Sequence, residues 1–288
     1  MKAISLLTAM QNGAKRIPIG LIAAAGFFFQ HNATALPVMV HLGSDSDFAV
    51  LAGSGITIAG AINSTTITGD IGTFPTTSIT GLGNVVLNGV NHAGDAVTQN
   101  AKNDLVAAYN DAAGRAADTT VAGGFDLAGQ TLFSGVYSDA SSLFLSGTLT
   151  LNAQGNPDAV WVFQAGSTLI TASNSTVDLI NGAQACHVFW QVGSSATLGT
   201  GTDFVGNILA LSSITLNTGA TVDGRVLAQN GAVTLDANTI TRSVCNTGGS
   251  GGTGGTTVPD RGSTLLLLVS GLATLFLFER RFFSGSTA

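Results

Sequence analysis

The most regular chemical feature of this sequence is a threonine followed by a leucine. The pair recurs along the chain, and we consider as one series the copies at Thr148, Thr168, Thr197, Thr215 and Thr234. The last three members of this series lie 18 and 19 residues apart. Each offers a hydroxyl and a methyl group but no charge. Repeated on a rigid surface, such groups can order water or contact a neutral surface, and no evident catalytic group accompanies them.

The spacing of the repeat predicts a β-solenoid. A second thread runs through Phe204, Val222 and Ile240, which are separated by 18 residues each. Apolar blocks such as "VWVFQ" (160–164) and "VFWQV" (188–192) lie between the threads. Three short strand-like pieces per repeat, with glycine or asparagine at the junctions, describe one solenoid coil. A β-sandwich of hairpins would not produce an in-phase repeat of the same residue types.

Alternation along the strands divides each coil into an inside and an outside. Side chains of a strand point alternately to its two faces. In the coil at 215–226 we therefore expect Leu216, Val222 and Val226 to point inward and form a stacked core. The residues expected to point outward are Thr215, Asn217, Thr221 and Asp223.

One face of the solenoid needs a cover, because the apolar residues of "VWVF" and "VFW" are consecutive. The segment 92–118 is rich in alanine and predicts one long helix, at about 94–118. Its apolar stripe at helical spacing consists of Val97, Ala101, Leu105, Ala108, Tyr109 and Ala112. A helix laid along the solenoid would bury this face and leave two faces for solvent.

Threonines in register on stacked strands would form a grid of hydroxyls and methyls. Adjacent strands lie about 4.7–4.9 Å apart and alternate residues about 6.6–6.8 Å apart. This spacing can match the oxygens of an ice plane. Threonine is also common on ordinary exposed strands, so the periodicity by itself favours a scaffold or an adhesin over ice binding.

Three stretches carry a resemblance to a known family: "LGSDSDFAVLAGSGIT" (42–57), "VWVFQAGSTLITAS" (160–173) and the long segment from "NGAQACHVFWQV" to "DANTI" (181–240). The region from about 42 to 245 resembles the DUF3494 ice-binding (antifreeze) family. The resemblance implies an all-β dominated fold, a right-handed discontinuous β-helix with three faces per coil and one long α-helix alongside. It also implies that a flat face adsorbs to ice and inhibits ice growth and recrystallisation.

Some members of that family carry a Thr-Ala/Gly-x-Thr/Asn motif on the ice-contacting face. Here "TASN" (171–174) and "TGAT" (218–221) match it, whereas "TGTD" (200–203) ends in aspartate and the next coil has "DANT" (236–239). The ice-binding residues implied are Thr171, Asn174, Thr200, Thr218, Thr221 and Thr239. The Thr-Leu series is the second candidate, and the sequence leaves open which exposed face contacts ice.

Composition and spacing argue against several other functions. Only 9% of the residues are charged, and 36–247 holds fourteen Asp against four basic residues, which does not suit nucleic acid. His41, His92 and His187 lack the close spacing of a zinc site. "SDSD" (44–47) lacks the rest of a twelve-residue calcium loop. We expect no metal and no cofactor.

An enzyme is a further possibility, because β-helices include polysaccharide lyases. Such chemistry needs clustered carboxylates, or calcium with a basic residue. Asp178, Asp203, Asp223 and Asp236 could form a row, with only Arg225 and Arg242 as nearby cations. We expect no enzymatic activity. The alternative function is a non-catalytic cell-surface adhesin that binds a glycan or a neighbouring cell.

The N-terminal end predicts export. Basic residues precede the apolar run 17–29, and Ala33-Thr34-Ala35 has the small-x-small form of a cleavage site. Residues 1–35 are therefore expected to be a signal peptide and 36–247 the ice-binding domain. The protein is expected to be secreted or attached to the cell envelope or surface.

The C-terminal end predicts a sorting or membrane segment, 258–288, after a Gly-rich linker at 248–257. "VPDRGST" (258–264) resembles VPDSG-type sorting signals processed by exosortase-like systems, with Arg261 in place of the usual serine. The following apolar stretch, 265–278, is short for a stable span, which needs about 17–25 residues. We expect transient membrane association and a sorting protease as partner.

Cys186 and Cys245 are the only cysteines. In an exported protein they could pair. Stacked repeats would place them beyond disulfide reach unless the chain end folds back, so the sequence leaves both outcomes open.

Overall fold

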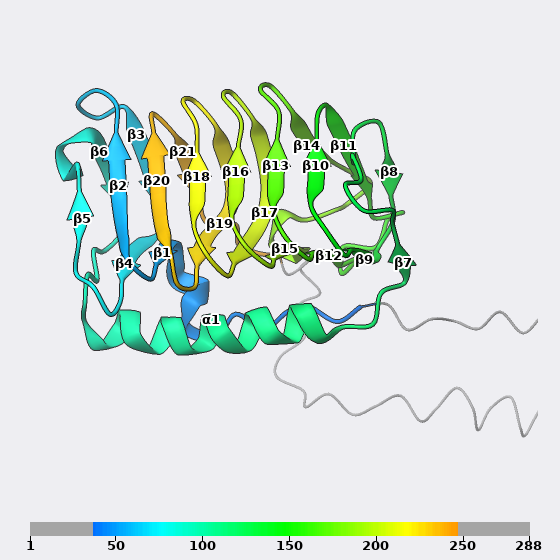
Figure 1. Cartoon of the computed structure of the whole chain (residues 1–288), viewed down its shortest axis with the longest axis horizontal. Helices are drawn as coiled ribbons and strands as arrows, with labels where there is room; N and C mark the ends of the chain where they lie inside the picture. Colours follow the sequence, from blue (N-terminus) through cyan, green and yellow to red (C-terminus); the bar gives the residue numbers. More distant parts are fainter. Residues whose placement is uncertain (1–36, 247–288) are drawn as a thin grey trace, which may run out of the picture. The chain divides into compact units, whose positions relative to one another are not determined.

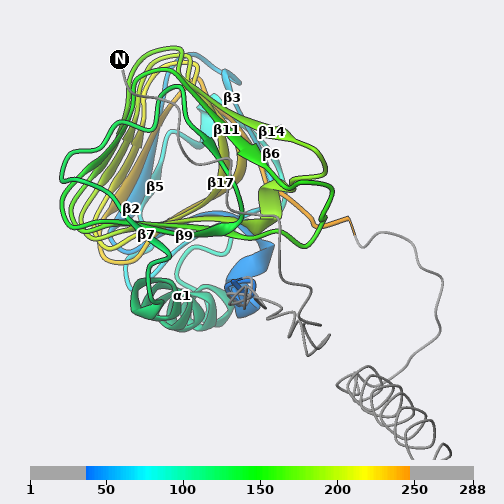
Figure 2. The ribbon, with the colours of Figure 1, turned by 90° about the vertical axis from the view of Figure 1, so that its right-hand side faces the viewer.

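A computed structural model describes residues 37–246, which wind into coils with a triangular cross-section (Figures 1 and 2). The predicted signal peptide, linker and C-terminal tail lie outside the described residues. Neighbouring strands in the coils are parallel. Within 37–246, no helix combines the length and apolarity needed to cross a membrane.

One face of the coils, which we name the ladder face, is a sheet of seven strands (Figure 1). In spatial order they are β10 (Leu143–Leu145), β13 (Leu169–Thr171), β16 (Ala196–Leu198), β18 (Ile214–Leu216), β20 (Ala232–Asp236), β2 (Gly55–Ala59) and β5 (Ile79–Thr80). The N-terminal strands β2 and β5 thus follow β20, the last strand of this face along the chain. This order confirms the discontinuous β-helix.

The helix face lies beside α1 (Ala96–Gly114). Its strands, in spatial order, are β7 (Thr119–Thr120), β9 (Gly135–Asp139), β12 (Trp161–Ala165), β15 (Val188–Val192), the second halves of β17 (Asp203–Ala210) and β19 (Thr221–Ala228), β1 (Phe48–Ala52) and β4 (Asp70–Thr73). Both β17 and β19 bend onto another face at glycines with positive φ, Gly206 (114°) and Gly224 (153°). The helix face and that other face are therefore continuous.

The remaining face, which we name the third face, carries the first halves of β17 and β19. Its other strands are β8 (Thr131–Leu132), β11 (Thr148–Asn152), β14 (Thr176–Ile180), β21 (Thr239–Thr241), β3 (Thr65–Thr68) and β6 (Val85–Asn88). Three short 3₁₀ helices complete the described elements: η1 (Gly43–Asp47), η2 (Leu82–Asn84) and η3 (Ala185–His187).

The interior of the coils is the apolar core that the repeat predicts. Leu216, Val222 and Val226 are all buried. The thread at intervals of 18 residues is a stack, because Phe204 pairs with Val222 and Val222 pairs with Ile240. Burial of these stacked side chains removes apolar surface from water in every coil, which is the main stabilising contribution to a solenoid.

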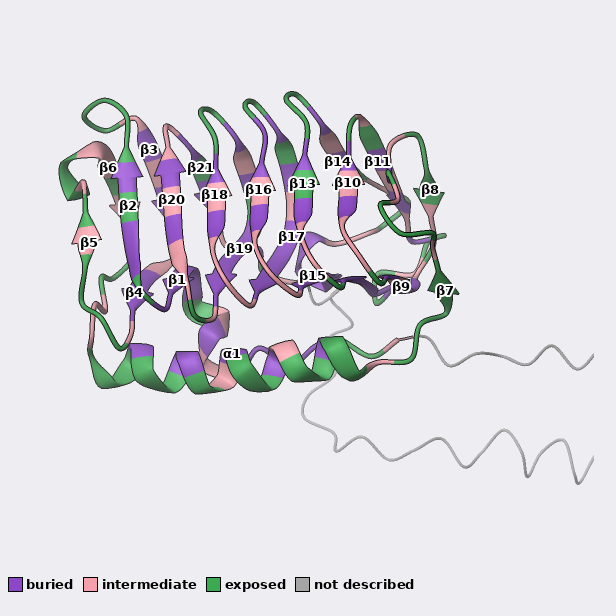
Figure 3. Cartoon of the chain, in the orientation of Figure 1, coloured by how far each residue is buried: buried purple, intermediate pink, exposed green. Residues whose placement is uncertain are grey.

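Helix α1 covers the helix face as predicted, although it is shorter than the expected 94–118 (Figure 3). It begins after Asp95, whose carboxylate accepts a hydrogen bond from the Thr98 amide at 2.8 Å. Ala101, Leu105, Ala108 and Ala112 are buried against side chains of β12, β15 and β17. The prediction was wrong for Val97, which is 45% exposed, because Thr98 and Lys102 occupy the inner side of the first turns.

Two glutamines on the outer side of the helix face form hydrogen bonds with α1. Gln164 Nε2 donates to the carbonyl of Ala112 at 2.8 Å, at the C-terminal end of α1. Gln191 Nε2 donates to the Tyr109 hydroxyl at 2.8 Å. These bonds satisfy helix-end and buried polar groups that water does not reach.

The two cysteines form a disulfide, with 5.4 Å between the Cα atoms of Cys186 and Cys245. The segment after β21 folds back onto η3, which is the condition under which pairing was possible. His187 lies with the two sulfurs in a group whose possible ligand atoms are within 4.8 Å of one another. Because the sulfurs are bonded to each other, neither can serve as the thiolate ligand of a metal.

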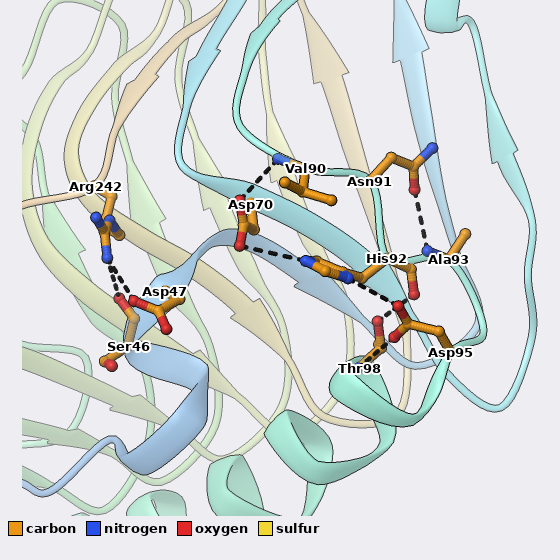
Figure 4. A network of polar contacts seen from close by, with 10 residues as sticks. All are labelled: Ser46, Asp47, Asp70, Val90, Asn91, His92, Ala93, Asp95, Thr98 and Arg242. Carbon is orange, nitrogen blue, oxygen red and sulfur yellow. Dashed lines mark hydrogen bonds and ion pairs between the residues drawn. The ribbon is translucent and has the colours of Figure 1, made fainter.

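Polar contacts hold the N-terminal coil in place beside the helix face (Figure 4). Arg242 forms an ion pair of 2.8 Å with Asp47, and the same guanidinium donates to the Ser46 carbonyl at 3.3 Å. His92 lies between two carboxylates, 3.4 Å from Asp70 and 2.8 Å from Asp95. The Arg242 contacts join η1 to a C-terminal coil, and the His92 contacts join β4 to the start of α1.

Candidate functional site

One outward-pointing residue of each ladder-face strand is in register with those of its neighbours. It is the middle residue of each strand except in the two-residue β5, where it is the last residue. Along the face the row consists of Phe144, Ile170, Thr197, Thr215, Thr234, Thr57 and Thr80. The last five positions are all threonine. We name these five residues the threonine ladder.

The threonine ladder combines part of a predicted series with two residues that the sequence reading missed. Thr197, Thr215 and Thr234 belong to the Thr-Leu series, and their flanking residues Ile214 and Leu216 are buried in the core. Thr57 and Thr80 come from two successive N-terminal coils, which hold β1 to β3 and β4 to β6. The alternation in "GITIAG" (55–60) indicates a strand with Thr57 on its outer side. It does not indicate that this strand pairs with β20, which is distant in sequence.

The ladder presents a neutral, regular surface. Its five rungs span four strand intervals, about 19 Å in total at the usual strand spacing. Thr57 and Thr80 are exposed and the other three are half-buried, with the Thr80 hydroxyl 3.4 Å from that of Thr57. The strands of this face contain one charged residue, Asp236, whose carboxylate accepts a hydrogen bond from Thr218.

The other two members of the Thr-Leu series are not part of the ladder. Thr148 lies in β11 on the third face, where it pairs with Thr176. Thr168 precedes β13, and its hydroxyl is 2.7 Å from that of Ser142. Ile170 is the residue in register with Thr197. Grouping these two threonines with the others was wrong, because the same dipeptide falls at different phases of the coil.

The family-type motifs form the corner turns between the ladder face and the third face. Asp203, Thr221 and Thr239 pair with one another, so "TGTD", "TGAT" and "DANT" are equivalent turns. The second residue of each turn has a positive φ, at Gly201 (66°), Gly219 (73°) and Ala237 (51°). The third residue of each is fully buried, at Thr202, Ala220 and Asn238.

"TASN" is out of phase with these turns. Thr176 is the residue that pairs with Asp203, so the equivalent turn is 173–176, and Asn174 takes the left-handed position with φ 59°. Thr171 lies in β13 with only 4% of its surface exposed. Its hydroxyl is 2.9 Å from that of Thr202 and accepts a hydrogen bond from the Gly199 amide. The expectation that Thr171 contacts an external surface was therefore wrong.

The remaining first-choice residues lie on two different surfaces. Asn174, Thr200 and Thr218 are exposed in the corner turns, whereas Thr221 and Thr239 lie on the third face. The structure does not bring these five residues together on one plane.

The third face differs from the ladder face in its charge. Asp178, Asp203 and Asp223 are exposed on it, and Thr221 donates a hydrogen bond of 2.7 Å to Asp203. Partial desolvation by the surrounding protein raises the pKa of Asp223, and the neighbouring Asp203 adds to the increase. The cations considered for catalysis are engaged elsewhere, because Arg225 is buried with its guanidinium on the Ser46 carbonyl. Asp203 pairs with Thr221 and Asp223 pairs with Val205, and Asp236 ends β20 on the ladder face, so the four aspartates do not form the row considered for an enzyme.

Comparison with known proteins adds independent evidence. The profile of the family described as ice-binding-like matches residues 50–241. An ice-binding protein of Nostoc sp. (strain HG1) is 45% identical over 273 residues, which covers 94% of this chain and 98% of that protein. An ice-binding protein of a Colwellia species is 38% identical and covers 80% of this chain and 93% of its own length. A crystal structure of an ice-binding protein from an Antarctic biological consortium matches with a TM-score of 0.69 at 47% identity, covering 72% of this chain and 93% of that one.

Proposed function

The chain belongs to the ice-binding-like family, and from that premise we propose that it adsorbs to ice through its ladder face and inhibits ice growth and recrystallisation. The observation that carries this proposal is the unbroken register of Thr197, Thr215, Thr234, Thr57 and Thr80 on one neutral face.

The physical argument rests on repetition. Each rung offers a hydroxyl that can hydrogen-bond to a water oxygen and a methyl around which water orders. A single rung binds weakly. Five rungs on a hydrogen-bonded sheet act together and lose little freedom on binding, because threonine is stiff at χ1 and the strands are already ordered. An adsorbed protein then blocks the advance of the crystal where it sits.

Charge favours the ladder face over the third face. Ionised side chains hold their own hydration shells, and removing that water is costly unless a partner charge replaces it. The third face carries Asp178, Asp203 and Asp223, while the ladder-face strands carry only Asp236 at a corner. The ladder face is therefore the better match to uncharged, ordered water.

Two single substitutions test this assignment. Thr215→Tyr places a ring on the central rung, and we expect it to prevent close contact with ice along the whole ladder. Thr221→Tyr places the same ring on the third face, and we expect adsorption to continue. The measurements are ice-affinity partitioning and thermal hysteresis, with far-UV circular dichroism to verify the fold. Loss of adsorption in Thr221→Tyr but not in Thr215→Tyr would move the ice-binding surface to the third face.

We also propose that the protein is not an enzyme. The family relatives are named as ice-binding proteins, and the aspartates considered for catalysis are divided between two faces of the coils. No observation favours the alternative of a surface adhesin.

Export and attachment to the cell envelope remain part of the proposal. The Cys186–Cys245 disulfide supports an oxidising compartment. Transient membrane association and a sorting protease are inferred from 258–288. Sequencing the N-terminus and weighing the mature protein by mass spectrometry tests both. An intact N-terminus at Met1 would contradict export through a cleaved signal peptide.

A further inference from the structure

The threonine ladder crosses a junction between segments that are distant in the chain. Thr234 lies in β20 and its neighbouring rung Thr57 lies in β2, so no turn connects the two strands directly. Thr57 belongs to the N-terminal coil that meets β20, and Thr80 belongs to the coil stacked beyond it. The alignment of these rungs with the others depends on the contacts made at the junction.

We propose that Asn238 is a positioning residue for ice binding, which sets the register of the N-terminal coil at the corner that follows β20. This inference rests on the proposed function. Asn238 is fully buried in the corner turn between β20 and β21. Its side chain does not reach the surface and acts only through its neighbours.

On one side, Asn238 holds the preceding coil. Its Nδ2 donates to the carbonyls of Asn217 at 2.9 Å and Ala220 at 3.1 Å. Its Oδ1 accepts a hydrogen bond of 2.6 Å from the amide of Asp236, the last residue of β20. The side-chain amide thus uses both donors and its acceptor to fix the end of a ladder strand.

On the other side, the backbone of Asn238 holds the N-terminal coil. Its amide donates to the Thr65 hydroxyl at 3.3 Å, and Thr65 is itself fully buried. Its carbonyl accepts a hydrogen bond of 2.8 Å from the Thr66 amide. One residue therefore links the coil before the junction to the coil after it.

Equivalent corners make similar contacts, but within the continuous chain. Thr202 bonds through its hydroxyl to Ala172 of the preceding coil, and its carbonyl accepts a hydrogen bond of 2.8 Å from the Thr221 amide of the following coil. Ala220 has no polar side chain at the same position. In these corners the chain itself passes from one coil to the next and limits slippage. At the junction only non-covalent contacts do so.

The consequence of a slip follows from the alternation of a strand. Strand β2 pairs with β20 over five residues, with Thr57 opposite Thr234 between the buried Ile56 and Ile58. A shift by one residue would exchange inward and outward side chains. A smaller displacement would break the alignment of Thr57 and Thr80 with the remaining rungs while the core stays largely intact.

The test compares two buried asparagines. Asn207 is also fully buried, and its Nδ2 donates to the carbonyls of Cys186 and Val188, at a corner away from the ladder face. We expect Asn238→Ala to lower thermal hysteresis severalfold at equal concentration near 0 °C, while Asn207→Ala retains it. Asn238→Thr should restore most of the loss, because Thr202 serves an equivalent corner through its hydroxyl.

A cross-linking measurement reports the register of β2 against β20 and does not require ice. Cysteines at 57 and 234 should form a disulfide readily in the otherwise native chain, since neighbouring strands place their Cα atoms about 4.8 Å apart. The side chain of Asn238 fixes the corner whose backbone receives Thr65 and Thr66, so we expect Asn238→Ala to slow this reaction severalfold. Cross-linking between positions 215 and 234 should slow less, because the chain itself connects those two coils. Unchanged cross-linking at the junction, or equal loss of hysteresis in the Asn238→Ala and Asn207→Ala variants, would overturn the inference. Absence of ice adsorption by the wild type would instead refute the proposed function, and the cross-linking result would still decide the role of Asn238.

Discussion

The Cys186–Cys245 disulfide joins the last described segment to the corner between the third face and the helix face. Removing this bond tests how much it contributes to the stability of the protein. Replacing both residues by alanine removes the bond without leaving a buried hydroxyl. The cysteines are 59 residues apart in sequence. For a closed loop of this length, the chain-entropy relation gives a loss of about 4 kcal/mol in the free energy of unfolding.

That loss should be visible as a lower melting temperature. For a domain of this size, about 1 kcal/mol corresponds to about 2–4 °C, so we expect the double variant to melt about 8–16 °C below the wild type. Thermal unfolding followed by far-UV circular dichroism measures the change. Wild-type protein in a reducing agent serves as the matched control and should melt near the double variant.

Ice binding should respond differently from stability. The disulfide lies at η3, and none of the threonine ladder belongs to that corner. Near 0 °C, where the variant is still folded, thermal hysteresis should equal that of the wild type. A melting temperature unchanged by both the substitutions and the reducing agent would refute the reasoning, because the segment after β21 would then be held without the cross-link.

Two further predictions concern the ladder and the N-terminal segment. Ile170 is 38% exposed and in register with Thr197. Ile170→Thr should therefore extend the ladder to six rungs and raise thermal hysteresis. An equal or lower hysteresis would argue against the number of rungs as the determinant of activity. Asp45 is fully buried and neither of its carboxylate oxygens has a hydrogen-bond partner among the described residues. Burial raises its pKa from 3.8 to about 8. The folded protein therefore binds this proton more tightly than the unfolded chain, and the resulting stability is lost as pH rises from 3.8 toward about 8. An asparagine side chain stays neutral at every pH, so denaturant unfolding should show Asp45→Asn gaining stability relative to the wild type over that range, and parallel pH profiles would contradict this.

Local periodicity was enough to predict the coils and their cover. Phe204, Val222 and Ile240 recur at one interval and stack in the core. Leu105 and Ala108 fall on one side of a helix and are buried there. These features depend on residues close together in sequence, so a single chain reveals them.

The composition of the ladder could not be predicted in full, because it depends on pairing between distant segments. Thr57 joins Thr234 only after the N-terminal coil docks beyond β20. The match of "TASN" to a four-residue motif also led to a wrong prediction for Thr171. Strand pairing places the equivalent corner turn at 173–176 and not at 171–174. The residue types in the sequence predict a surface of threonine hydroxyls and methyls, whereas the register of the strands determines which threonines lie on it.

The position of the N-terminal coil has a consequence for biosynthesis. Strands β2 and β3 leave the ribosome early, but their sheet neighbours β20 and β21 are among the last to be made. Contacts of such long sequence separation form slowly, because the intervening chain must first be brought together. A nascent or prematurely terminated chain therefore exposes unpaired β-strand edges, which are prone to aggregate, and only full-length synthesis closes them.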